Sequence, residues 1–197
     1  MASFTKLLLN LNTSWKVKAI APYLHPGEKI LDFGCGDLSL AIGLSKKISD
    51  LHLTGIDTEK FLTSKPKNIK AITYNGKKLP FADNAFDTVI SVYVFHHTRN
   101  AKYFYGECLR VAAKKVIFIE AVARKKYEIP FMKIVDNLSN VWKKEKIAKA
   151  EEFYTLREWE NILKNKGNVT QVKDIPTITS LLPIGKGYLF IVSKKSL

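Results

Sequence analysis

The sequence predicts an α/β fold in which helices cover both faces of a mostly parallel sheet. Short and almost wholly apolar runs alternate with amphipathic runs of helical length along most of the 197 residues. Strands that are apolar throughout are typical of parallel sheets buried on both faces. A chain of this length suits one domain, and it contains no repeat, low-complexity segment or linker. We therefore expect a single α/β domain.

The first half of the chain supplies most of the expected sheet. Thr13 or Ser14 can cap a first helix, which His25-Pro26-Gly27 then ends near Tyr23. The apolar run 29–33 predicts a buried strand, and Gly34-Cys35-Gly36 is the turn after it. The elements expected next are a helix over 38–48, strands over 51–56, 69–74 and 86–95, and a helix over 99–111.

The second half adds three strands and an inserted segment. A strand is expected over 116–122, and two more over 169–175 and 187–192. The residues Thr155 to Glu158 form a capping box, which begins a helix ended by Gly167.

The inserted segment, residues 124–153, departs from the alternation of strands and helices. Its apolar residues Phe131, Val135, Leu138 and Trp142 follow a helical spacing. This stripe can pack in the core as an ordinary helix, cover a pocket as a lid, or contact a membrane surface. The expected domain therefore spans residues 1–197, with a helical lid or cap at about 124–153.

Composition excludes several classes of protein. Hydrophobic residues make up 46% of the chain and charged residues 25%, which rules out intrinsic disorder. The two cysteines, Cys35 and Cys108, have no CxxC partner or ligand-spaced histidine, so we predict no metal site and a reducing, cytoplasmic location. No apolar run reaches the ~18 residues that span a bilayer.

The net charge of +14 suggests a polyanion as a partner, but its makeup weakens that interpretation. Only four of the 32 basic residues are arginines, the side chain that best makes bidentate contacts to phosphates and bases. A solvated basic surface therefore explains the charge better than a nucleic-acid site. Contact with RNA or with an anionic membrane stays open.

The turn Asp32-Phe33-Gly34-Cys35-Gly36-Asp37 is the most informative stretch. Ligands of open α/β sheets bind at the carboxyl ends of the strands, where this turn lies. A dinucleotide site would place Asp57 on the ribose. The GxGxxG motif of such a site, however, requires a third glycine where this chain has Ser39, and the carboxylates of Asp32 and Asp37 would repel a pyrophosphate. The turn therefore favours a cationic ligand without phosphates, such as S-adenosylmethionine.

Five motifs in order support that ligand. They are Leu31 to Gly36, Asp57, the run Asn75 to Phe81, the run Phe86 to His97, and the run Glu107 to Val111. With these motifs the chain resembles the class I S-adenosylmethionine-dependent methyltransferases, in particular the methyltransferase type 11 family that includes the ubiquinone and menaquinone biosynthesis C-methyltransferases. The resemblance implies a Rossmann-like, doubly wound sheet of seven strands with the last strand antiparallel.

The resemblance also implies residue roles. Asp32 and the backbone of Gly34, Cys35 and Gly36 would face the methionine part of the cofactor, and Asp57 would accept hydrogen bonds from the ribose. The alternative role for Asp57 is to cap the N-terminus of a helix in the segment that follows it.

The remaining cofactor contacts also follow from the resemblance. Asn75 and Gly76 would contact the adenine, and Phe33 or Leu38 would line the cofactor site. Leu38 stands where relatives often carry a third glycine, so the turn must close with a side chain present.

The acceptor of the methyl group would sit at the end of the fourth strand. Tyr93, His96 and His97 lie there, and His97 is the candidate general base. Alternatively, the histidines shape the pocket or pack beneath the next helix. The expected acceptor is a small or lipid-like molecule; an RNA or protein methyltransferase and a non-catalytic cofactor-binding protein remain alternatives.

Overall fold

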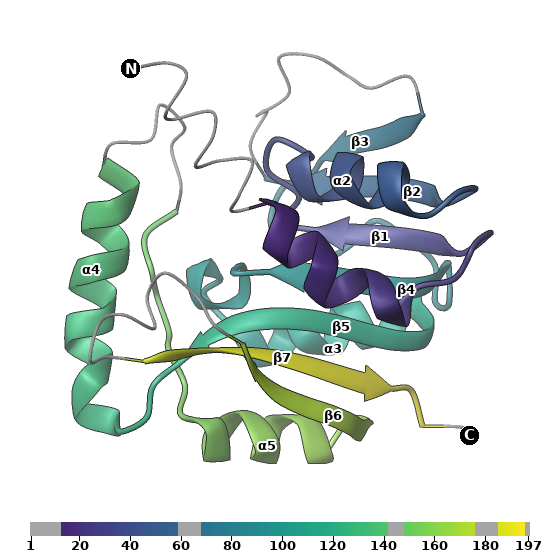
Figure 1. The fold of residues 1–197 in the computed structure, drawn as a ribbon. Helices are drawn as coiled ribbons and strands as arrows, with labels where there is room; N and C mark the ends of the chain where they lie inside the picture. Colours follow the sequence, from purple (N-terminus) through teal and green to yellow (C-terminus); the bar gives the residue numbers. More distant parts are fainter. Residues whose placement is uncertain (1–12, 59–67, 142–147, 176–184, 196–197) are drawn as a thin grey trace.

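The computed structural model describes residues 13–58, 68–141, 148–175 and 185–195. One seven-stranded sheet runs through these residues in the order β3-β2-β1-β4-β5-β7-β6 (Figure 1). The strands are β1 (Lys29–Phe33), β2 (His52–Asp57), β3 (Ile69–Thr73), β4 (Phe86–Val92), β5 (Ala112–Val122), β6 (Asn168–Ile175) and β7 (Lys186–Ser193). Strands β1 to β5 pair in parallel, whereas β7 runs antiparallel to both β5 and β6. The predicted Rossmann-like sheet is confirmed.

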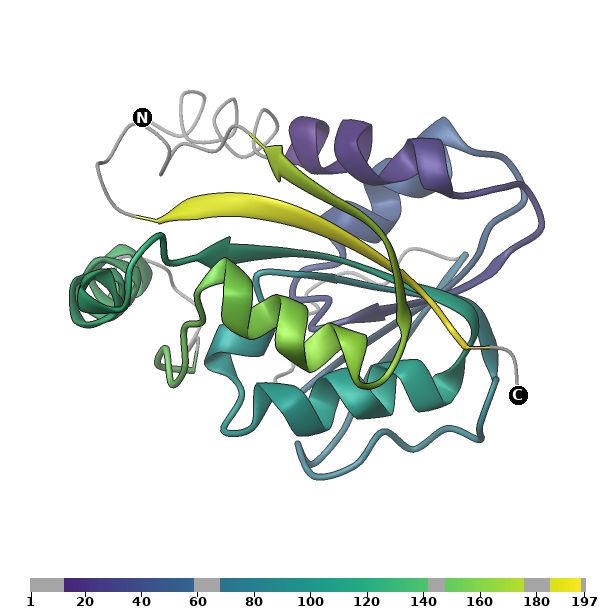
Figure 2. The same cartoon turned by 90° about the horizontal axis from the view of Figure 1, so that it is seen from below.

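Helices cover both faces of this sheet. The helix over residues 13–20 and α2 (Ser39–Lys47) lie on one face, and α3 (Ala101–Val111) and α5 (Leu156–Lys164) lie on the other (Figure 2). The remaining helices are η1 (Ala21–Tyr23), η2 (Phe95–His97), η3 (Lys126–Glu128) and α4 (Ile129–Val141). The alternating elements therefore form the doubly covered sheet that the apolar strands predict.

Strand β5 shows how the pleat divides the core into two layers. Val116 and Phe118 face the layer formed with α3 and α5, while Ile117 and Ile119 face the layer formed with residues 13–20 and α2. All four side chains are fully buried. Successive side chains of a strand point to opposite faces, so an apolar strand of this length can fill both layers at once.

The capping box at the start of α5 forms as predicted. The Thr155 hydroxyl accepts a hydrogen bond from the Glu158 amide, and the Glu158 carboxylate accepts one from the Thr155 amide at 2.9 Å. These two bonds satisfy amide groups that the first turn of a helix leaves without partners.

The end of the fourth strand differs from its predicted boundary. Strand β4 ends at Val92 rather than at residue 95, because Tyr93 adopts φ +57° and a short 3-10 helix follows. The carboxylate of Glu120 stabilises this bend by accepting hydrogen bonds from the amides of Val94 and Phe95, each at 2.8 Å. An apolar pattern cannot reveal a bend imposed by a distant side chain.

The inserted segment forms α4, which stands beside the carboxyl ends of the parallel strands (Figures 1 and 2). Its predicted stripe is not core: Phe131 and Leu138 are 52% and 59% exposed. Met132, one residue along, is the buried contact, and it packs with Ala123, Ala150 and Phe153. Phe131 and Leu138 therefore point away from the domain, Val135 is half-buried, and Trp142 lies outside the described residues.

Candidate functional site

The parallel topology brings four chain segments to one edge of the sheet. Strand β1 pairs with β2 and β4, and β2 pairs with β3, so the residues that follow these strands lie side by side. They are the glycine turn after β1, Asp57 at the end of β2, Asn75 after β3, and Tyr93 after β4. This edge is where open α/β sheets bind their ligands.

The two glycines of the turn have different structural roles. Both have positive φ, +72° at Gly34 and +49° at Gly36. A Cβ on Gly34 would lie 2.3 Å from the side chain of Val94, so this glycine permits close packing against the chain after β4. Among the described residues, a Cβ on Gly36 would meet nothing within 4 Å. Open space therefore faces Gly36, where a ligand can approach the backbone.

Asp57 joins the turn to the end of β2. One carboxylate oxygen accepts a hydrogen bond from the Gly36 amide at 2.9 Å, and the other accepts one from the Thr58 amide at 2.7 Å. Asp57 thus fixes the turn at the end of β2; its ribose role stays a prediction.

Asp32 is a buried carboxylate with an incomplete set of partners. It is 2% exposed, and its Oδ2 has no hydrogen-bond partner among the described residues. Burial, together with the nearby charge of Asp57, raises the pKa of Asp32 to about 7, although Lys16 opposes this effect. A buried acceptor of this kind suits a cationic donor, and the ammonium group of S-adenosylmethionine is one.

Lys16, whose charge acts on Asp32, lies beside two aromatic rings. The rings of Trp15 and Tyr93 meet edge to face at 6.4 Å, and Lys16 Nζ lies 5.8 Å from the centroid of the Tyr93 ring. Tyr93 has a positive φ, which is uncommon for a residue with a bulky side chain and tends to mark functional sites. The first helix therefore contributes Trp15 and Lys16 to this edge of the sheet.

Three residues of the predicted cofactor site have side chains that pack within the protein, and their cofactor contacts stay predictions. Phe33 is buried, with its ring against Phe95 and Phe104 at 5.8 and 5.7 Å. Leu38 is fully buried at φ +63°, so the turn does close with a side chain present. Cys35 is buried too, and burial raises the pKa of its thiol.

The adenine contacts remain predictions. The side-chain oxygen of Asn75 accepts a hydrogen bond from the Lys77 amide at 3.0 Å, which shapes the loop after β3. Gly76 has φ +71°, and a Cβ there would lie 3.2 Å from Thr58. The loop after β3 therefore lies against the end of β2, beside the predicted ribose position.

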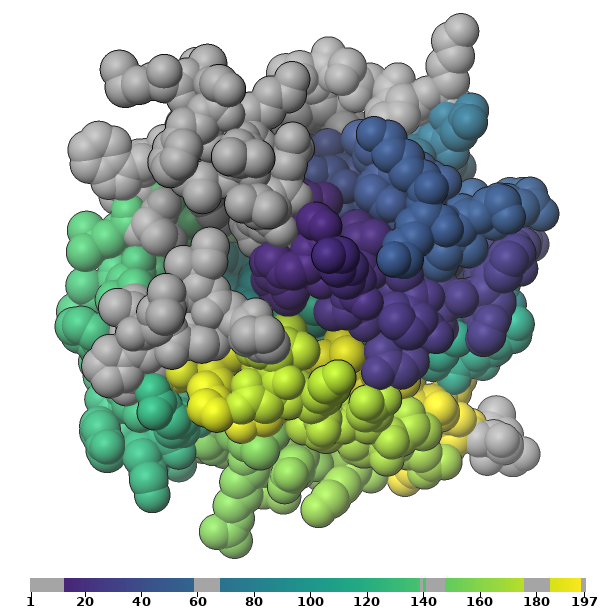
Figure 3. All heavy atoms as spheres, in the orientation of Figure 1, coloured from purple at the N-terminus to yellow at the C-terminus, as the bar shows by residue number. Residues whose placement is uncertain are grey.

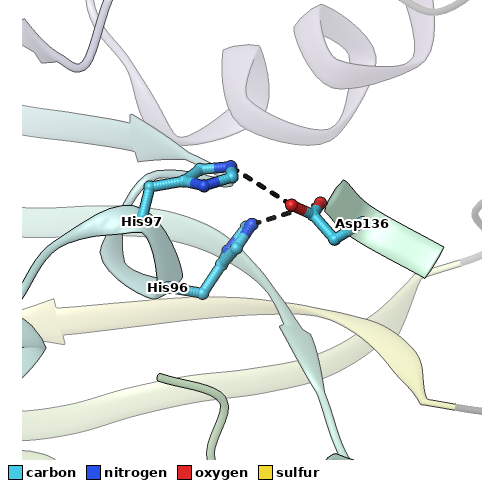
Figure 4. Close-up of side chains that lie close together, drawn as sticks. All are labelled: His96, His97 and Asp136. Atoms are coloured by element: carbon cyan, nitrogen blue, oxygen red, sulfur yellow. Dashed lines mark ion pairs between the residues drawn. The ribbon is translucent and has the colours of Figure 1, made fainter. Parts of the chain in front are cut away.

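The two histidines converge on a carboxylate from the inserted helix. His96 and His97 extend from η2 toward Asp136 on α4 (Figure 4). The Nε2 atoms of His96 and His97 lie 3.6 and 3.8 Å from the two carboxylate oxygens of Asp136. Behind His96, its Nδ1 lies 2.6 Å from Glu120 Oε2. The cysteine and histidine spacing predicts no metal site, and no local pattern in the sequence indicates this cluster.

The two histidines differ in protonation. Burial alone would lower the pKa of His96, but the charges of Glu120 and Asp136 outweigh it and raise the pKa to about 9. Burial and the neighbouring His96 lower the pKa of His97. Burial raises the pKa of Tyr93. His97 is therefore the only one of the three predicted catalytic residues that is neutral and able to accept a proton near neutral pH.

Four residues that shape this edge were not singled out by sequence reasoning. They are Trp15, Lys16, Glu120 and Asp136. For Glu120 a signal exists, since it is a carboxylate inside an otherwise apolar strand. Asp136 gives no local signal, because only the fold brings α4 to the histidines.

Comparisons with known proteins agree with this geometry. Residues 31–119 match a family model described as a methyltransferase domain. The ubiquinone/menaquinone biosynthesis C-methyltransferase UbiE of Rickettsia prowazekii is 33% identical over 93 residues, which are 40% of this chain and 38% of that protein. An uncharacterised protein of Methanocaldococcus jannaschii is 29% identical over 166 residues, which are 73% of this chain and 62% of that protein. The chain thus spans less than two thirds of the length of these relatives.

Solved structures share the fold over nearly the whole chain. The YcgJ protein from Bacillus subtilis aligns with a TM-score of 0.67 at 16% identity, covering 95% of this chain and 100% of that one. A SAM-dependent methyltransferase from Aquifex aeolicus aligns with a TM-score of 0.64 at 19% identity, covering 93% and 90%. Over residues 31–119 the chain is therefore similar to methyltransferases, and it shares its fold with solved structures that include an S-adenosylmethionine-dependent methyltransferase.

Proposed function

We propose that this chain transfers the methyl group of S-adenosylmethionine to a small, lipid-like acceptor. The observation that carries the proposal is the edge where the open turn at Gly36, the carboxylate of Asp57 and the buried carboxylate of Asp32 meet. When bound, the cofactor supplies an electrophilic methyl group on a sulfonium. The protein has to hold that group and align the acceptor with it.

The residues at the edge divide this work. Asp32, buried and next to Lys16, would accept from the ammonium of the cofactor, and Asp57 would accept from its ribose. The acceptor would lie beyond Tyr93, near the histidines at the end of β4. Methyl transfer is an in-line displacement, so alignment and exclusion of water contribute most of the catalysis.

The lipid-like character of the acceptor is supported by relatives and by α4. One relative is named as a quinone-biosynthesis methyltransferase, and another, from Gibberella zeae, is named as a sterol 24-C-methyltransferase and is 28% identical over 105 residues. Helix α4 exposes Phe131, Ile134 and Leu138, each more than half exposed, at i, i+3 and i+7.

Helix α4 lies at the outer edge of the molecule in Figure 3. No helix among the described residues has both the length and the apolar character to cross a bilayer. An amphipathic helix can instead rest in the plane of a membrane surface. Peripheral contact through this face of α4 would bring the acceptor site to a lipid-like substrate.

A transfer assay tests the proposal. The full chain is incubated with methyl-labelled S-adenosylmethionine in four separate reactions, each with one candidate acceptor. The acceptors are a reduced demethylated menaquinone, cycloartenol, total RNA, and a mixture of small basic proteins. We expect label in one of the apolar acceptors. Label found only in RNA or only in protein would refute the lipid-like acceptor.

Matched variants connect that activity to the site. Asp57→Asn should weaken cofactor binding by about 10- to 100-fold, because a charge-assisted hydrogen bond contributes about 1.5–3 kcal/mol. Asp174→Asn is the control, since Asp174 is an exposed carboxylate on β6, paired with Lys186. Equal cofactor affinity in the two folded variants would show that Asp57 has a structural role only and does not bind the cofactor.

A further inference from the structure

We propose that His96, His97 and Asp136 form a binding site for a divalent first-row transition-metal ion of the Zn²⁺ type. One ligand atom from each residue lies within 4.8 Å of the other two. The closest pairs are the 3.6 and 3.8 Å separations between each histidine Nε2 and an oxygen of Asp136. Bonds of about 2.0–2.2 Å to one ion would hold such atoms about 3.4 Å apart, so small side-chain movements complete the site.

Glu120 provides the second observation in favour of a metal ion. Its Oε2 accepts from His96 Nδ1 at 2.6 Å, and its Oε1 accepts from two backbone amides, so the carboxylate is held firmly. Histidines that bind metals almost always donate their other ring N–H to a carboxylate or carbonyl. This bond directs Nε2 of His96 toward Asp136, as Figure 4 shows.

The charge of the cluster also favours a cation. Glu120 and Asp136 place two carboxylates on either side of His96, which is 3% exposed. Asp136 Oδ2 also accepts from Asn140 Nδ2 at 3.0 Å, which orients the carboxylate.

The ligand set selects the class of ion. Two imidazoles and one carboxylate suit Zn²⁺, Fe²⁺ or Co²⁺, whereas Mg²⁺ and Ca²⁺ prefer oxygen ligands alone. The side chains of His97 and Asp136 are 16% and 24% exposed, so an ion can enter from solvent. Three protein ligands leave at least one position open to water. If the proposed function holds, an oxygen of the acceptor can take that position.

This role competes with general-base catalysis by His97. A neutral imidazole has one acceptor nitrogen, so a His97 that binds a metal ion through Nε2 cannot also accept a proton from the acceptor. The site also ties α4 to the end of β4, because Asp136 comes from the inserted helix and the histidines from η2.

Direct metal titration of the full chain without cofactor tests the site. The probe is Co²⁺, followed by its visible absorption, with Zn²⁺ as the competitor. We expect one Co²⁺ ion per chain, displaced by Zn²⁺ and not by Mg²⁺. Because no cofactor or acceptor is present, the outcome is independent of the proposed methyl transfer.

Variants separate this site from adventitious binding. His97→Ala and Asp136→Asn should each weaken Co²⁺ binding by about 100-fold or more, and Asp136 is exposed enough that its amide variant should fold. The matched control is His25→Ala with His52→Ala, which removes the two exposed histidines elsewhere. The proposal is overturned if wild type binds Co²⁺ no more tightly than the double variant His97→Ala, Asp136→Asn does. It is also overturned if the control variant loses Co²⁺ binding.

Discussion

Asp32→Asn should separate the stability of the protein from its ability to bind the cofactor. Asp32 is almost fully buried, and its pKa rises from an ordinary value of 3.8 to about 7. The folded state therefore holds a proton on Asp32 between about pH 4 and pH 7, where the unfolded state does not. The free energy of unfolding must then fall as pH rises through this interval.

The size of the effect follows from the same interval. From 3.8 to about 7, at about 1.4 kcal/mol per pH unit, the ionised carboxylate costs the folded state up to roughly 4 kcal/mol. Asparagine carries no such charge. The variant should therefore gain about 2–3 kcal/mol relative to wild type between about pH 5 and about pH 8.

Urea unfolding of both proteins without cofactor, at those two pH values, measures this gain. Calorimetry on the same samples should show weaker binding of S-adenosylmethionine to the variant, because the ammonium loses its charged acceptor. A stability difference that is the same at both pH values would refute the reasoning, since Asp32 would then ionise normally in the folded protein.

Four further substitutions test the local geometry. Gly34→Ala should lower the melting temperature by many degrees, because the added Cβ would overlap the side chain of Val94. Gly36→Ala should lower the free energy of unfolding by only about 1–2 kcal/mol, because the residue has a positive φ but open space around it. Equal losses of stability in the two variants would contradict this account of the turn. Thr155→Ala removes the capping box of α5 and should lower the free energy of unfolding by about 1 kcal/mol, measured in urea; no change would show that the cap contributes nothing. Leu138→Ala should leave the melting temperature within a degree or two and weaken sedimentation with anionic phospholipid vesicles, because Leu138 is 59% exposed; a large fall in melting temperature would place it in the core.

The fold could be predicted because its signals are local. Apolar strands, a glycine turn and a capping box each depend on residues close together in the sequence, and all three appear in the structure. Strands that are apolar throughout then imply a parallel sheet covered on both faces. The cofactor edge could be anticipated for the same reason, since the ends of adjacent parallel strands must meet.

The parts that could not be predicted depend on contacts between distant residues. The bend after Val92 is fixed by Glu120 on the next strand, and the histidine cluster is completed by Asp136 on the inserted helix. The periodicity of Phe131, Val135 and Leu138 correctly predicts a helix, but periodicity alone does not say which side of that helix meets the domain. Met132 makes that contact, and Leu138 does not.

Calorimetric titration of the full chain with S-adenosylmethionine, S-adenosylhomocysteine and NAD tests the central claim most directly. The claim is that the edge formed by Asp32, Gly36 and Asp57 binds a cationic adenosyl ligand and excludes a pyrophosphate. The predicted result is that both adenosyl ligands bind at one shared site while NAD gives no response. Binding of NAD with no response to either adenosyl ligand would contradict the account.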